Sequence, residues 1–143
     1  MPKTSSAAEQ IGAECLAVRL RMLNRRVSRI YDEVLRPHGV GVAQLNLLVA
    51  IANMEQAHPA ELVASLGLEK STLSRNVKVL AAREWVEVWI AADGRSQLLT
   101  LSDAGQQLLA AALPAWQRAQ ARAHALLGEE LAGALGEVSL RPR

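Results

Sequence analysis

The chain has 143 residues, of which 50% are hydrophobic, and this length and composition favour one globular domain, residues 1–143, and exclude general disorder. The formal net charge is only +2 at pH 7, so charge alone does not identify a nucleic-acid-binding protein. No apolar run near the start resembles a secretory signal and no stretch is as long as a membrane span, so we expect a cytoplasmic protein.

A long helix is expected first, over about residues 10 to 36. Its apolar residues recur in alternating steps of four and three, a spacing typical of helix-on-helix packing. This seam consists of Leu16, Leu20, Leu23, Val27, Ile30 and Val34. The same helix carries a cluster of arginines, Arg19, Arg21, Arg25, Arg26 and Arg29. Such a cluster is either a solvated face or, beside a dimer cleft, a site for an anionic ligand.

Residues 59 to 83 are predicted to form a pair of helices joined by a tight turn. His58 and Pro59 are typical of a helix cap and a first helical residue. Gly67 ends this first helix, because glycine readily takes the left-handed conformation that turns the chain sharply. The second helix is expected over residues 70 to 83.

The second helix of the pair has one apolar and one polar face. Leu73, Val77 and Leu80 face inward at helical spacing. The outward face presents Ser71, Thr72, Ser74, Arg75 and Lys78. Arginine pairs with guanine through two hydrogen bonds, whereas serine, threonine and lysine reach bases or phosphates. On an isolated helix such a face is more often simply solvated, so the DNA interpretation depends on the segment that follows.

That segment predicts a β-hairpin. Residues 85 to 90 and 97 to 101 are rich in strand formers, and the turn between them contains Asp93 and Gly94. Helix, turn, helix and hairpin in this order indicate a winged helix-turn-helix, which binds duplex DNA. Arg95 near the tip suits a narrow minor groove, with Asp93 holding either the wing or the guanidinium.

A second long helical region is expected from Ser102 to about residue 140. Ser102 is its predicted cap, Pro114 should kink or interrupt it, and Gly133 and Gly136 weaken its end. Its seam continues through Leu109, Leu113 and Trp116, with Ala119 and Ala123 allowing close approach. We interpret residues 10–36 and 102–140 as dimerisation helices around a DNA-binding core, about residues 37–101. The alternative is a monomer in which these helices pack on each other.

Two segments resemble a known family. STLSRNVKVLAAREWVEV and ADGRSQLLTLSDAG are similar to the recognition helix and wing of MarR-type transcriptional regulators. The segment CLAVRLRMLNRRVSRIYDEVLRPHGVGVAQLNLLVAI extends the resemblance upstream, so that it covers roughly residues 12 to 127. Glu69 departs from the family pattern, because a negative charge stands there near the expected phosphates.

The resemblance implies a homodimeric repressor or activator that binds a pseudo-palindromic operator and releases it on a small-molecule or oxidative signal. It places Ser71, Thr72, Ser74, Arg75 and Lys78 at the major groove and Arg95 at the minor groove. Gln44, at the start of an earlier helix, is expected at the DNA backbone. No cofactor is expected.

Three residues are candidates for receiving the signal. Arg19 and Trp116 are candidates for holding a small anionic aromatic effector, although Trp116 equally suits the core. Cys15 is the single cysteine and a candidate redox sensor, with Arg19 one helical turn away to favour the thiolate. The alternative is a small residue packed beside Leu16 and Leu20.

Other functions have less support in the sequence. No phosphate-loop, HExxH or GxSxG pattern is present, and the three histidines fall in separate elements without metal-ligand companions, so neither an enzyme nor a metal site is expected. The main alternative to DNA binding is a winged-helix module that contacts another protein.

Overall fold

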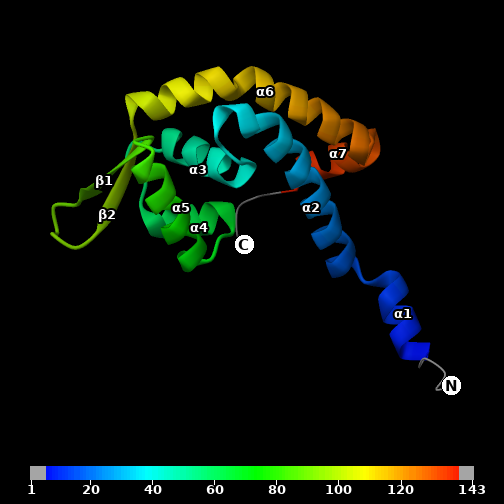
Figure 1. Ribbon diagram of the computed structural model, residues 1–143. Coiled ribbons are helices and arrows are strands. Elements are labelled where there is room, and N and C mark those ends of the chain that lie inside the picture. The colour runs from blue at the N-terminus through cyan, green and yellow to red at the C-terminus, as the bar shows by residue number, and fades with distance from the viewer. Residues whose placement is uncertain (1–5, 139–143) are drawn as a thin grey trace.

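The computed structural model describes residues 6–138, which form two lobes (Figure 1). The core lobe consists of η1 (Arg36–His38), α3 (Val42–Ala52), α4 (Pro59–Leu66), α5 (Lys70–Ala82), β1 (Val86–Ile90) and β2 (Gln97–Leu101). The helical lobe consists of α1 (Ser6–Glu14), α2 (Leu16–Leu35), α6 (Asp103–Leu127) and α7 (Glu129–Gly136). The predicted fold class, mainly helical with a small hairpin wing, is confirmed.

The predicted helix pair is confirmed almost to the residue. α4 begins at Pro59 after His58, and it ends at Gly67, which is left-handed with a φ of 62°. The Gly67 N–H donates to the Val63 carbonyl and so closes the helix. α5 then starts at Lys70 and buries Leu73 and Leu80 against the core.

The predicted hairpin is also confirmed, with its first strand one residue shorter. β1 and β2 pair antiparallel, with Val86 opposite Leu101 and Ile90 opposite Gln97. Ala57, in the loop between α3 and α4, exchanges two backbone hydrogen bonds with Leu99, at 3.0 and 2.9 Å. This bridge ties β2 to the helices, so the base of the wing is fixed while its tip projects outward.

The hydrophobic core fills the space between α3, α4, α5 and the hairpin, and the adjoining parts of α2 and α6 contribute Leu35, Ala112 and Ala115 to it. Its largest fully buried side chains are Leu35, Leu47, Leu48, Ile51, Leu62, Leu80 and Leu99. They come from five different elements, so one core fixes the recognition helix and the wing relative to each other.

α2 and α6 pack against each other through small residues. Ala112, Ala115, Ala119 and Ala123 of α6 are all buried. Alanines spaced by three and four along one face let two helix backbones approach closely. Ala119 and Ala123, predicted to allow close approach of helices, are buried within a single chain, and a role in dimerisation stays a prediction.

The first predicted helix is wrong in one respect, because the chain breaks at Cys15 into α1 and α2. Cys15 is extended, with ψ of 107°. The Ala13 carbonyl, which a continuous helix would pair with a backbone N–H, accepts a hydrogen bond from the Arg19 guanidinium instead. No residue of α1 is buried, so no packing keeps it in line with α2, and Figure 1 shows it projecting away.

The last helical region also differs from expectation. Ser102 caps α6 as predicted, accepting a 3.0 Å hydrogen bond from the Gly105 N–H. Pro114 does not interrupt α6, which runs unbroken to Leu127 and curves gently over α3 and α2 in Figure 1. The break comes instead at Gly128, where φ is 78°, and α7 ends at Gly136. Residues 139 and 140 of the predicted region lie outside the described residues.

Within residues 6–138, no single helix is both long and apolar enough to cross a membrane. A pair bent by 76°, Ser6–His38 with Val42–Ala52, meets the requirement jointly by length and composition alone. The second member of this pair contributes Leu47, Leu48 and Ile51 to the core.

Candidate nucleic-acid interface

The outward face of α5 presents the residues predicted for the major groove. Ser71, Ser74, Arg75 and Lys78 are exposed, and Thr72 is half-buried. The Arg75 guanidinium lies 3.4 Å from the Thr72 hydroxyl, which accepts a long hydrogen bond from it. Because the opposite side of α5 is anchored by Leu73 and Leu80, this polar face is held by a rigid element. It offers donors on a helix of the width that a major groove admits.

The tip of the wing is built around the Asp93 carboxylate. One of its oxygens accepts hydrogen bonds from the backbone N–H groups of Arg95 and Ser96, both at 2.8 Å. The other accepts from the Ser96 hydroxyl at 2.5 Å. Gly94 supplies the left-handed turn, with a φ of 73°. Of the two roles predicted for Asp93, the geometry favours holding the wing, and the exposed Arg95 side chain is left to project from it.

These hydrogen bonds also hold the Asp93 carboxyl in its charged form. Donation from the Ser96 hydroxyl and from the Arg95 and Ser96 backbone lowers the pKa of Asp93 to about 2. The wing tip therefore keeps its internal bonds throughout the neutral range.

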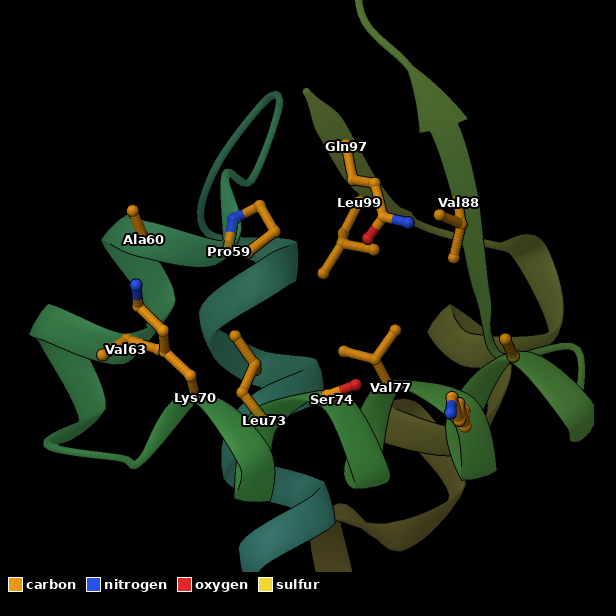
Figure 2. Close-up of a pocket in the computed structure, with 12 residues that line it drawn as sticks. Pro59, Ala60, Val63, Lys70, Leu73, Ser74, Val77, Val88, Gln97 and Leu99 are labelled. Atoms are coloured by element: carbon orange, nitrogen blue, oxygen red, sulfur yellow. The ribbon is translucent and has the colours of Figure 1, made fainter. Parts of the chain in front are cut away.

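A groove runs beside the recognition helix, and Figure 2 shows its lining side chains converging from α4, α5 and the hairpin. Its volume is about 470 Å³. Leu73, Val77 and Leu99 give it an apolar floor, while Lys70, Ser74 and Lys78 bring polar groups to it from α5. The predicted contact residues Ser74 and Lys78 therefore stand between this groove and the outward face.

Sequence reasoning missed Lys70, the first residue of α5, which is exposed and lines the groove. The signal was present, because Lys70, Ser74 and Lys78 recur every four residues and so share one side of the helix. Arg83, just beyond α5, was also missed. Its Nη1 donates to the Gly39 carbonyl at 2.9 Å, a contact that local periodicity does not reveal.

Gln44 is half-buried near the start of α3. Its side-chain oxygen accepts a long hydrogen bond, 3.5 Å, from the Gly41 N–H at the start of that helix. The amide nitrogen of Gln44 is the end that remains for a phosphate, so a backbone contact stays a prediction.

The two residues predicted for an effector do not share a site in this chain. The Arg19 guanidinium is engaged with the Ala13 carbonyl near the break between α1 and α2. Trp116 lines a cavity of about 480 Å³ between α3 and α6, beside Leu45, Val49 and Leu113. Arg19 does not line that cavity.

Cys15 is half-buried at the start of α2. Neither of its predicted companions forms an apolar pocket around it, because Leu16 and Leu20 are exposed by 71% and 58%. Tyr31, further along α2, donates a hydrogen bond from its hydroxyl to the Gln120 side chain of α6, and partial burial raises its pKa above the usual value for tyrosine. Within residues 6–138, no three His, Cys, Asp or Glu side chains gather as a metal site would require.

The helix pair, the exposed donor face of α5 and the adjoining hairpin define a winged helix-turn-helix protein. Comparison with known proteins gives the same class. Residues 38–96 match the model of the MarR family. Among curated proteins, no sequence match was found.

Solved structures extend the likeness over most of the chain. The M. tuberculosis transcriptional regulator MOSR, solved in complex with DNA, is 33% identical over 80% of this chain and 84% of its own, with a TM-score of 0.73. A mutant of E. coli MarR in complex with operator DNA is 22% identical over 93% and 94%, with a TM-score of 0.78. A probable transcriptional regulator from Pseudomonas aeruginosa is 23% identical over 86% and 92%, with a TM-score of 0.76. The chain belongs to the MarR family of transcriptional regulators.

Proposed function

We propose that this regulator binds duplex DNA sequence-specifically, as a homodimer on a pseudo-palindromic operator. The observation that carries the proposal is the exposed polar face of α5, anchored from behind by buried leucines and flanked by a wing with an exposed arginine. The DNA complex of MOSR, a relative at 33% identity, supports duplex DNA as the partner.

Each side chain of the interface has a proposed role. Arg75 reads a base edge in the major groove, because its guanidinium can donate two parallel hydrogen bonds to guanine. Ser71, Thr72, Ser74 and Lys78 contact neighbouring bases or phosphates. Arg95 enters the minor groove, Asp93 holds the wing that carries it, and Gln44 contacts the backbone.

Dimerisation is proposed from the apolar surface that the helical lobe leaves uncovered. Ile11, Leu16, Leu20 and Met22 are exposed by 66%, 71%, 58% and 61%. Leu131 and Leu135 of α7 add exposed apolar surface at the same lobe. Large apolar side chains left exposed on one lobe are typical of a protein interface, and a symmetric partner presents the same surface in return.

We propose further that operator binding is repressive and is released by a small anionic aromatic effector. The apolar cavity beside Trp116 suits an aromatic body. Arg19 is the proposed partner for the anion, which requires that Arg19 leave the Ala13 carbonyl or come from the second subunit. Oxidation of Cys15 is the alternative signal. The regulator works in the cytoplasm, and the proposal contains no catalytic step.

The test begins with selection of bound duplexes from a random-sequence library, followed by affinity measurements on the selected operator. We expect Arg75→Ala to weaken operator binding by about 1 to 3 kcal/mol and to relax sequence preference at one position. Arg95→Ala should weaken binding with less loss of sequence discrimination, since it responds to groove shape. Arg118→Ala, at an exposed arginine of α6, is the matched control and should leave affinity unchanged.

Unchanged affinity in all three variants would contradict the proposed interface. If Arg75→Ala, Arg95→Ala and the Arg118→Ala control all bind the selected duplex like the unmodified protein, the proposed interface is wrong. DNA would then be bound through another surface, whereas a library that yields no preferred duplex would favour a winged-helix module that contacts protein.

A further inference from the structure

The turn after the recognition helix is held by an unusual concentration of contacts. The Glu84 N–H donates to the Ala81 carbonyl at 2.9 Å and the Trp85 N–H to the Leu80 carbonyl at 3.0 Å. Glu84 takes the left-handed conformation, with a φ of 60°. This pair of bonds with a left-handed residue is the Schellman ending of a helix, and it fixes the direction in which the chain leaves α5.

Arg83 connects this turn to the end of α2. Its Nη1 donates to the Gly39 carbonyl at 2.9 Å, across 44 residues of sequence, and its guanidinium lies 5.1 Å from the centre of the Trp85 ring. Stacking on the indole holds the guanidinium plane in place, so the hydrogen bond is directed rather than free to swing.

Because Gly39 has no side chain, it leaves space for the Arg83 guanidinium. It is left-handed with a φ of 70°, and a Cβ added there would lie 2.8 Å from Arg83 Nη1. Gly39 follows η1, which continues directly from α2. Asp32 of α2 also accepts a 2.8 Å hydrogen bond from the Val42 N–H, so the whole corner between α2 and α3 is fixed to α2.

The same turn is held by α6 from the other side. The Ser102 N–H donates to the Trp85 carbonyl at 3.0 Å, and the Ser102 hydroxyl donates to the Glu84 carbonyl. Residues 83–85 therefore tie the recognition helix to the corner that follows α2 and to the residue that caps α6, where the core lobe meets the two long helices of the proposed dimerisation lobe.

We infer that Arg83 is a positioning residue that sets the orientation of α5 relative to the α2–α6 lobe, and through it the spacing of operator half-sites that a dimer accepts. This inference rests on the proposed function. In a two-fold dimer the distance between recognition helices must match the half-site spacing. Loosening the tie between α5 and the lobe then widens the range of accepted spacings without changing how one helix reads one half-site.

The experiment measures the affinity of the full chain for the selected operator, for the same operator with one base pair inserted or deleted between half-sites, and for a single half-site. The unmodified protein should prefer the selected spacing. In Arg83→Ala that preference should fall by about fivefold, the equilibrium weight of one net hydrogen bond, while half-site affinity stays within about twofold. Arg83→Lys, which keeps the charge but not the planar fork, should fall between the two.

Gly39→Ala tests the same contact from the other partner, because its Cβ would displace the Arg83 guanidinium. It should loosen spacing preference although Arg83 is retained. Arg118→Ala is the control for removing an exposed arginine. Thermal unfolding of each variant ensures that only folded protein is compared.

Three outcomes would count against the inference. A uniform loss of affinity for every duplex in Arg83→Ala, restored fully by Arg83→Lys, would make Arg83 a phosphate contact and overturn the positioning role. An unchanged spacing profile in both Arg83→Ala and Gly39→Ala would overturn it as well. Failure of the unmodified protein to select any duplex would instead overturn the proposed function, and the inference with it.

Discussion

The core lobe and the helical lobe differ in how far the apolar seams of their helices are exposed to solvent. In the core lobe, the helix seam residues Leu48, Leu62 and Leu80 are 0% exposed, and the exposed apolar residues lie mainly on the wing, where Trp89 and Ile90 are 53% and 63% exposed. In the helical lobe, Leu16 and Leu20 belong to an equally regular apolar seam yet are more than half exposed. The helices of the core lobe bury their apolar faces within one chain, whereas the exposed first half of the α2 seam is the surface proposed to meet a partner.

Sequence periodicity therefore identifies an apolar face of a helix but not what covers that face. The seam of α2 begins exposed at Leu16 and becomes partly covered from Leu23 onward, where α6 packs on it through buried alanines. The second half of α2 is therefore packed against α6 within the chain, whereas its first half is exposed and is the part proposed to meet a second chain. The predictions below separate these two halves and the junction between the lobes.

The largest expected effect is on the core lobe. Leu48→Ala removes a fully buried side chain and should lower the free energy of unfolding by about 2 to 5 kcal/mol, because it leaves a cavity that closes only partly. Chemical denaturation at two protein concentrations measures this loss. A cost well below about 1 kcal/mol would mean that the core is not packed as described.

The matched change in the helical lobe is Leu20→Ala, which should act on association rather than on the fold of a chain. Burial of a leucine in an interface is worth about 1.5 to 3 kcal/mol, so the dimer dissociation constant should rise by roughly tenfold or more. Sedimentation velocity over a range of concentrations detects the shift. If Leu20→Ala sediments like the unmodified protein at every concentration, the α2 seam is not the interface.

The junction between the lobes is sensitive to size. A Cβ at Gly105 would lie 2.3 Å from the Trp85 carbonyl and 2.7 Å from a Leu101 methyl group. Gly105→Ala should therefore destabilise the protein by about 1 to 3 kcal/mol through overpacking. Gly133→Ala, at a helical glycine with open space around it, is the control and should be neutral or slightly stabilising in thermal unfolding.

The smallest expected effect is at the wing tip, and it depends on pH. Hydrogen bonds lower the pKa of Asp93 to about 2 in the folded protein. The stabilisation of the wing tip by the charged carboxylate is therefore fully present above about pH 4, the pKa of an unfolded aspartate, and is lost as pH falls through about 2. The amide resonances of Arg95 and Ser96 should move together as pH falls from about 4 to about 2, because both amides donate to this carboxylate. Movement at about pH 5 or above would contradict the hydrogen-bonded wing tip, and Asp93→Ala should abolish the transition.

Much of the core lobe could be predicted from sequence because its signals are local. Gly67, the Leu73 to Leu80 seam and the Asp93–Gly94 turn each fix a backbone geometry within a few residues. The exposed face of α5 follows from that seam by helical geometry, so Arg75 could be placed from the sequence alone.

The features that could not be predicted depend on contacts between residues far apart in the sequence, or on the lack of packing against a helix. At the break beside Cys15, the Ala13 carbonyl accepts a hydrogen bond from the Arg19 side chain, and no residue of α1 is buried against the rest of the chain. Of the two effects expected at Pro114, interruption does not occur, because α6 continues through it with its buried alanines packed beneath. The tie between Arg83 and Gly39 crosses 44 residues, and no periodic pattern connects them.

Sequence-specific binding by a dimer is tested by a fluorescence anisotropy titration of a selected operator and of a scrambled duplex of equal length, at two salt concentrations. A sequence-specific dimer should bind the operator selectively at both concentrations and saturate at two chains per duplex. Equal and weak binding to both duplexes, lost at the higher salt, would contradict it, because attraction to phosphates alone gives that result.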